Sequence, residues 1–74
     1  MKKKYWKVGY SYYPHESLVS NSFIVKGTEQ AAKLFIKIEL FKEPMWVRNQ
    51  VSKKFNDKKN HQCLFIDEIE IIEI

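Results

Sequence analysis

The chain contains few of the residues that characterise several large protein classes. Its 74 residues include one cysteine, two glycines and two prolines. The single cysteine, Cys63, cannot form a disulfide within the chain, so we expect a reducing compartment, the cytoplasm. Two glycines are too few for a glycine-rich phosphate loop. No apolar run approaches the roughly 20 residues that a membrane-spanning helix needs, so we expect no membrane association.

Residues that support catalysis or metal binding are also scarce. A structural zinc site needs four ligands, and this chain offers only His15, His61 and Cys63. A Cys63 nucleophile would lack an orienting group and an oxyanion hole. Glu68 and Glu70 share one strand face, where a solvated surface is favoured over a cation site. We therefore predict a protein without enzymatic activity, cofactor or metal.

What the chain does have is an uneven charge. The formal net charge is +4, with +8 in residues 1–60 and −4 in residues 61–74. This balance is compatible with a nucleic-acid partner or an acidic protein surface. The favoured interpretation is structural, because opposite charges that face each other across strands stabilise a sheet. It pairs Lys2, Lys3, Lys4 and Lys7 with the acidic residues of the last strand, Asp67, Glu68, Glu70 and Glu73.

Apolar residues are numerous enough for a folded domain. Leu, Ile, Val and Phe supply 22 of the 74 residues, above the level of roughly 20% that is typical of disordered chains. A chain this short buries only about 60% of the surface that its unfolded form exposes, so we expect modest stability. Self-association into a homodimer is one way to bury more.

Period-two patterns predict two strands at the start of the chain. In residues 5–13 the aromatic and β-branched residues alternate with small and polar ones, and Pro14 ends the strand. Residues 15–20 form a polar connection. Residues 22–26 then read as a second strand with Phe23 and Val25 facing inward, joined to the first as a hairpin.

A helix follows, with Gly27 as a turn and Thr28 as its N-cap. Two apolar stripes run along it, and only one of them can face a single sheet. The wider stripe is predicted to face the core and consists of Ala31, Leu34, Phe35, Ile38 and Phe41. The spare stripe is expected to pack on the segment after Pro44 or in a dimer, and consists of Ala32, Ile36 and Leu40.

Pro44 ends that helix and is favourable at the first position of another. Residues 45–55 are therefore predicted as a short second helix that places Val47, Val51 and Phe55 on one face. Residues 56–60 read as a polar turn. Residues 62–74 read as the last strand. Its parity shifts from Ile69 and Ile71 to Ile72 and Ile74, which indicates a bulge or an end that lies over the sheet edge.

The resulting fold class is α+β, with the element order β-β-α-(α)-β in a single domain over residues 1–74. Residues 1–4 are expected to be a flexible basic N-terminus. A right-handed return after the helices makes the first strand central, in a three-stranded antiparallel sheet of order 2-1-3 with one main helix on one face.

Two surfaces are candidates for binding. The first is a basic edge with one aromatic residue: Trp46, Arg48, Lys53, Lys54, Lys58 and Lys59. Here cations could approach phosphates while the indole stacks, although an ordinary solvated surface with Trp46 capping the core is favoured. The second is the sheet face opposite the helix: Tyr5, Lys7, Tyr13, Ile24 and Lys26. A polar, solvated face explains that pattern at least as well.

Several segments together carry a resemblance to a group of proteins. They are Tyr-Trp-Lys-Val-x-Tyr-x-Tyr, Ser-Phe-Ile-Val-Lys, Thr-Glu-Gln-Ala-Ala at a helix start and Ile-Asp-Glu-Ile-Glu-Ile near the end. The chain is similar in these segments to short accessory proteins encoded by phages and other mobile elements of low-GC bacteria. The resemblance covers most of residues 5–43 and 64–74 and rests on fold motifs.

The resemblance implies a function without catalysis. Such proteins dock on a host protein or nucleoprotein, and inhibitors of CRISPR effectors are one example. Many of those inhibitors are acidic mimics of nucleic acid, whereas this chain is basic through residue 60. We therefore expect a small cytoplasmic interaction protein that binds and modulates a host protein or nucleoprotein complex. The alternative is a small nucleic-acid-binding protein that uses the basic edge.

Overall fold

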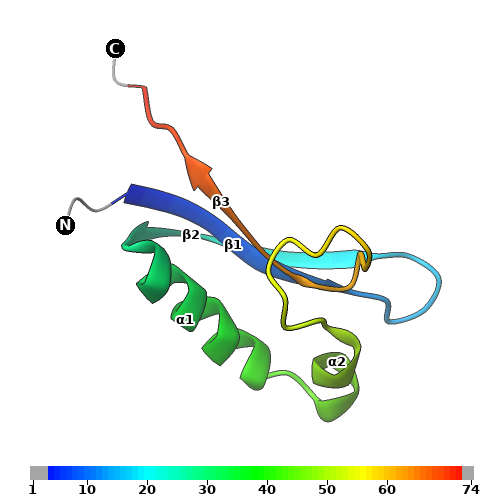
Figure 1. The fold of residues 1–74 in the computed structure, drawn as a ribbon. Coiled ribbons are helices and arrows are strands. Elements are labelled where there is room, and N and C mark those ends of the chain that lie inside the picture. The colour runs from blue at the N-terminus through cyan, green and yellow to red at the C-terminus, as the bar shows by residue number, and fades with distance from the viewer. Residues whose placement is uncertain (1–3, 73–74) are drawn as a thin grey trace.

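The computed structural model describes residues 4–72 and shows one helical layer on a three-stranded sheet (Figure 1). The elements are β1 (Lys4–Tyr12), β2 (Val19–Gly27), α1 (Glu29–Phe41), α2 (Met45–Gln50) and β3 (Leu64–Ile69). The sheet is antiparallel with the order β2-β1-β3. The predicted α+β class and strand order are confirmed.

β1 is the central strand and pairs along its length with both neighbours. Tyr5 lies opposite Lys26 of β2 and Ile69 of β3. The expected pairing of N-terminal lysines with the acidic last strand is present at Lys4, whose Nζ lies 3.1 Å from Glu68 Oε1. Lys4 therefore belongs to the sheet and not to the N-terminal segment to which the sequence assigned it. Lys2, Lys3 and Glu73 lie outside the described residues.

α1 begins where the sequence predicts. The Thr28 hydroxyl accepts a hydrogen bond from the Ala31 amide at 3.2 Å, which satisfies one of the free donors of the first turn. Glu29 lies in that turn, at the positive end of the helix dipole, and pairs with Lys33 at 3.0 Å. The helix ends at Phe41, three residues before Pro44.

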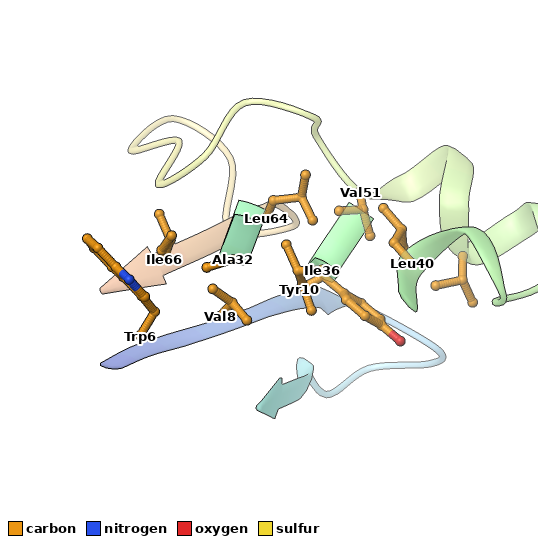
Figure 2. Packing of buried hydrophobic residues seen from close by; sticks show 10 residues of the cluster. Trp6, Val8, Tyr10, Ala32, Ile36, Leu40, Val51, Leu64 and Ile66 are labelled. Atoms are coloured by element: carbon orange, nitrogen blue, oxygen red, sulfur yellow. The ribbon is translucent and has the colours of Figure 1, made fainter. Parts of the chain in front are cut away.

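The orientation of α1 corrects the sequence prediction. Its buried residues are Ala32, Ile36 and Leu40, which form the stripe that the sequence analysis treated as spare. The sheet already contributes the large Trp6 and Tyr10 side chains to the core, and a stripe that begins with a small alanine fits over them. Figure 2 shows these helix side chains directed toward those of the sheet.

The stripe predicted to face the core is largely exposed. Leu34 is 59% exposed, Ile38 52% and Phe41 73%, and Ala31 is exposed as well. Of the predicted five, only Phe35 packs partly against the core, where its ring meets Phe23 edge-on at 5.4 Å. Phe23 faces the helix as predicted but sits at the margin of the core, with 36% of its surface exposed.

α2 is shorter than predicted and Pro44 is its N-cap residue. Val51 is extended, because the chain there leaves the helix to pair with the residues that lead into β3: the Ser52 amide donates to Gln62 O at 2.7 Å. Val47 and Val51 are still buried and Phe55 is partly buried. The apolar series of the second helix therefore reaches the core, but only its first part is helical.

The predicted turn after Phe55 is present and covers the outer edge of β3. Asn56 adopts a positive φ of 54°, which asparagine tolerates better than most residues. Its side-chain amide donates to Ile66 O at 2.9 Å, and its carbonyl accepts from the Ile66 amide at 3.0 Å. The turn thus satisfies edge groups that would otherwise be open to pairing.

β3 is shorter than the predicted strand. It ends at Ile69, and Glu70, Ile71 and Ile72 are not in a strand. Ile69 pairs with Tyr5 of β1. Within the described residues, only Lys4 of β1 lies beyond that pair, so a longer β3 would have little strand left to pair with. The shift of parity marks the end of the strand and not a bulge; Ile74 lies outside the described residues.

Candidate functional site: a cationic apolar groove between the helices

A groove lies where α1 ends and α2 begins. It consists of two adjoining hollows of about 290 and 320 Å³, which share Phe41, Arg48 and Lys53. We call it the α1–α2 groove, and it is lined by Lys37, Leu40, Phe41, Met45, Arg48, Asn49 and Lys53. Figure 1 shows the elements that carry these residues, the end of α1 and the short α2, at one end of the molecule.

The groove exists because Pro44 separates two helices that are each anchored to the core. Leu40 at the end of α1 and Val47 in α2 are both buried. Phe41, one position after Leu40, is therefore turned outward. The Arg48 guanidinium lies over the Phe41 ring, 4.8 Å from its centroid, and this cation–π contact joins the two helices across the groove.

The charges of the groove are all positive. Lys37, Arg48 and Lys53 line it, no acidic residue does, and none of the three forms an ion pair within residues 4–72. Lys53 Nζ donates to Arg48 O at 2.7 Å and Val51 O at 3.0 Å, so it serves the C-terminal carbonyls of α2. Arg48 Nε is buried and has no hydrogen-bond acceptor in the described part of the chain.

Glu43 is in the turn between the helices but is engaged elsewhere. Its carboxylate accepts a hydrogen bond from the Tyr10 hydroxyl, and the Asn21 amide donates to both groups at 3.2 Å. Desolvation by burial, followed by the hydrogen bond to Glu43, raises the pKa of Tyr10 to about 12. This network ties the turn to β1 and β2, and it directs the Glu43 carboxylate to the sheet.

An exposed apolar surface leads from the helix to the groove. We call Leu34, Ile38 and Phe41 the outer stripe. Leu34 and Ile38 each lie two residues from a buried position, about 200° further round the helix, so they face away from the core. Met45, 66% exposed, lies beyond Phe41 and lines the groove. α1 is therefore apolar on two opposite sides.

The predicted basic edge is not one surface. Trp46 and Arg48 are two residues apart on α2 and have different neighbours: Trp46 meets Tyr12 edge-on at 5.9 Å, whereas Arg48 stacks on Phe41. Of the six predicted residues, only Arg48 and Lys53 line the groove. The remaining lysines, Lys54, Lys58 and Lys59, are exposed between α2 and β3.

The predicted sheet face is assembled in part. Tyr5 and Lys26 face each other, with Lys26 Nζ 5.5 Å from the Tyr5 ring centroid, and Lys7 faces Ile24. Tyr13 lies past the end of β1, where the Gln50 side chain binds both its backbone amide, at 2.9 Å, and its carbonyl, at 3.0 Å.

Sequence reasoning missed five residues of the groove: Lys37, Leu40, Phe41, Met45 and Asn49. The available signal is the wider apolar stripe of α1, which ends at Phe41 close to Pro44. Its width favours the core as its position, and the structure instead leaves most of it exposed.

Comparisons with known proteins do not assign this chain to a family. No family model, curated protein or solved structure matches it. Within residues 4–72, no helix is long and apolar enough to cross a membrane. The same residues contain no group of three or more His, Cys, Asp or Glu side chains arranged to hold a metal ion.

Proposed function

We propose that this chain is a non-enzymatic interaction protein that docks on a host protein or nucleoprotein complex through the outer stripe and modulates it, as the phage accessory proteins that it resembles do. The observation that carries the proposal is the exposure of Leu34, Ile38 and Phe41, each more than half exposed on the side of α1 opposite the core. A surface helix typically has one apolar stripe, which faces the core, and polar residues on the opposite face, whereas α1 is apolar on both of these sides. A partner that covers the outer stripe would bury the second side.

The chemistry of the outer stripe favours a protein over other partners. Its contacts would be made by two aliphatic side chains and an aromatic ring, which gain free energy by leaving water. Binding of nucleic acid is led by cations that contact phosphates, and those are not the residues of the stripe.

A second candidate, binding of nucleic acid, is favoured by one observation. Lys54, Lys58 and Lys59 are exposed within six residues of one another. The one acidic residue among them, Asp57, accepts hydrogen bonds from the Ser52 hydroxyl at 3.1 Å and the Lys59 amide at 3.0 Å. Within residues 4–72 none of the three lysines forms an ion pair, so their ammonium groups can contact phosphates.

The proposed function is tested by comparing three immobilised forms of the chain in a low-GC bacterial lysate. The stripe variant, L34S together with I38S, should lose a stoichiometric partner that the parent chain retains. Leu18→Ser is the matched control, because Leu18 is 42% exposed in the connection between β1 and β2, outside both candidate surfaces, and it should retain that partner. Equal recovery by all three forms would contradict the proposal.

The second candidate is tested by fluorescence anisotropy with mixed-sequence single- and double-stranded DNA and RNA. Phosphate contacts would give binding that weakens steeply between about 50 and 200 mM salt and that is lost on reversing the charges of Lys54, Lys58 and Lys59. We expect no such binding. Its appearance would favour nucleic acid as the partner.

A further inference from the structure

We infer that the partner segment recognised by this chain is acidic: an apolar side chain of the segment enters the α1–α2 groove and a neighbouring carboxylate binds Arg48. This inference rests on the proposed function, because the groove begins at Phe41, the last residue of the outer stripe. It adds the chemical class of the partner, which the stripe alone does not define.

The size of the groove suits a side chain of a polypeptide. Small-molecule sites typically enclose roughly 300–1,000 Å³, and each hollow of the groove is at the lower limit of that range. Leu40 and Phe41 supply an apolar wall. An aliphatic or aromatic anchor in such a hollow, continuous with a flatter apolar stripe, is the arrangement by which interfaces concentrate their binding energy.

The charge of the groove selects an acidic segment. Three cations line it without an acidic residue. The two carboxylates nearest in the sequence are engaged, since Glu39 pairs with Lys42 at 2.7 Å and Glu43 binds Tyr10. A partner carboxylate would therefore meet positive groups that no internal acid neutralises.

Arg48 is the residue best prepared to bind that carboxylate. Its guanidinium is held over the Phe41 ring, which fixes its plane before a ligand arrives. Its Nε is buried and has no acceptor among residues 4–72, so a partner would bind the other donors of the guanidinium. Arginine presents a planar fork of donors that matches a carboxylate, and Arg48 lines both hollows of the groove.

The test begins with a selection that does not assume the answer. Random dodecapeptides displayed on phage are selected on the immobilised chain, and the enriched peptides are sequenced. We expect a consensus with one or two large apolar residues flanked by Asp or Glu. A basic or neutral consensus, or no enrichment, would overturn the inference.

The selected peptide is then labelled with fluorescein and titrated by anisotropy. Replacing its acidic residues by amides should weaken binding by about tenfold or more, and Arg48→Gln in the protein should weaken it by about tenfold. Lys54→Gln is the matched control, because it removes one charge outside the groove, and it should leave affinity within about twofold. Equal losses in R48Q and K54Q would overturn the inference.

Two further outcomes identify a different occupant. The first is displacement of the labelled peptide by a single-stranded oligonucleotide. If the oligonucleotide displaces the peptide equally well from the parent chain and from K54Q, nucleic acid binds in the groove. A dimer of the parent chain in light scattering that R48Q converts to monomer would place a second copy there, through its acidic and apolar residues 66–72. Either result would overturn the inference.

The two proposals can fail separately. Suppose that the stripe variant loses its lysate partner while the R48Q variant binds all peptides normally. The proposed function then stands, and the inference that the partner segment is acidic is wrong. If peptide binding depends on Arg48 while all forms recover the same lysate proteins, the groove is an acidic-peptide site and the docking face is wrong.

Discussion

Single residues define how the groove end of the molecule is attached to the sheet. The contact of Tyr10 with Glu43 crosses from β1 to the turn after α1, and Asn21 of β2 binds both groups. The network is partly buried, and such a network is stabilising when each member has a partner. Since Pro44 follows Glu43 directly, the same network positions the start of α2 and thus the wall of the groove.

The pKa of Tyr10 gives a pH-dependent stability. The folded chain raises that pKa from 10 to about 12, so the folded state keeps a proton that the unfolded state releases. The corresponding stability is fully present below pH 10 and is lost as the pH rises toward 12, with a loss of about 2–3 kcal/mol. Urea unfolding at pH 8, 10 and 11 measures it. Tyr10→Phe should be less stable at pH 8 but should lack this component of the alkaline loss; an identical alkaline slope in Y10F would contradict the assignment.

Gly9 and Gly27 make a matched pair for a second prediction. A Cβ at Gly9 would collide with the Asn21 carbonyl and the Phe65 ring, whereas a Cβ at Gly27 would make an ordinary 3.8 Å contact with the Cβ of Ala31. Gly9→Ala should therefore destabilise by about 1–3 kcal/mol, because the backbone of β2 must move. Gly27→Ala should change stability by no more than about 0.5 kcal/mol. Similar free energies of unfolding for the two variants would show that Phe65 does not lie across β1.

At the scale of elements, the orientation of α1 decides which surface is available for binding. Ile36 and Ile38 are the same residue type two positions apart, one fully buried and the other 52% exposed. The sheet is predictable from sequence because alternation sets the faces of β1 directly. The helix is less so, since both of its stripes are apolar and the choice between them depends on the shape of the sheet surface below.

This pair supplies the third prediction. Ile36→Ala should cost about 2–5 kcal/mol, because it leaves a cavity between α1 and the sheet. Ile38→Ala should cost less than about 1 kcal/mol but should weaken capture of the partner. Chemical denaturation of both variants measures the difference. If I38A proved as destabilising as I36A, the outer stripe would belong to the core and the docking surface would disappear.

At the scale of the whole molecule, long-range contacts account for what the sequence could not predict. α2 ends early because Gln50 binds the backbone of Tyr13, 37 residues away, and Ser52 forms a bridge with Cys63, beyond the following turn. The groove depends in turn on the placement of α2 relative to α1. Lys37, Phe41 and Arg48 lie up to eleven residues apart, so their convergence is not visible as a motif.

The shape and charge of the molecule lead to the last prediction. The fold measures 42 × 22 × 20 Å, and the end of β3 lies at the opposite end of the molecule from α2 (Figure 1), which contributes Arg48 to the groove. So small a core gives modest stability, and a ligand that binds only the folded state raises it by mass action.

A selected acidic peptide at about ten times its Kd should therefore stabilise the chain by roughly 1.4 kcal/mol, which corresponds to about 5–10 °C in Tm for a domain of this size. Differential scanning fluorimetry measures the shift. Arg48→Gln should remove most of this shift and Lys54→Gln should not, because Arg48 lines the groove and Lys54 does not. A shift that is as large with R48Q as with the parent chain would mean that the peptide binds elsewhere, and the cationic groove would then be a feature of the α1–α2 junction alone.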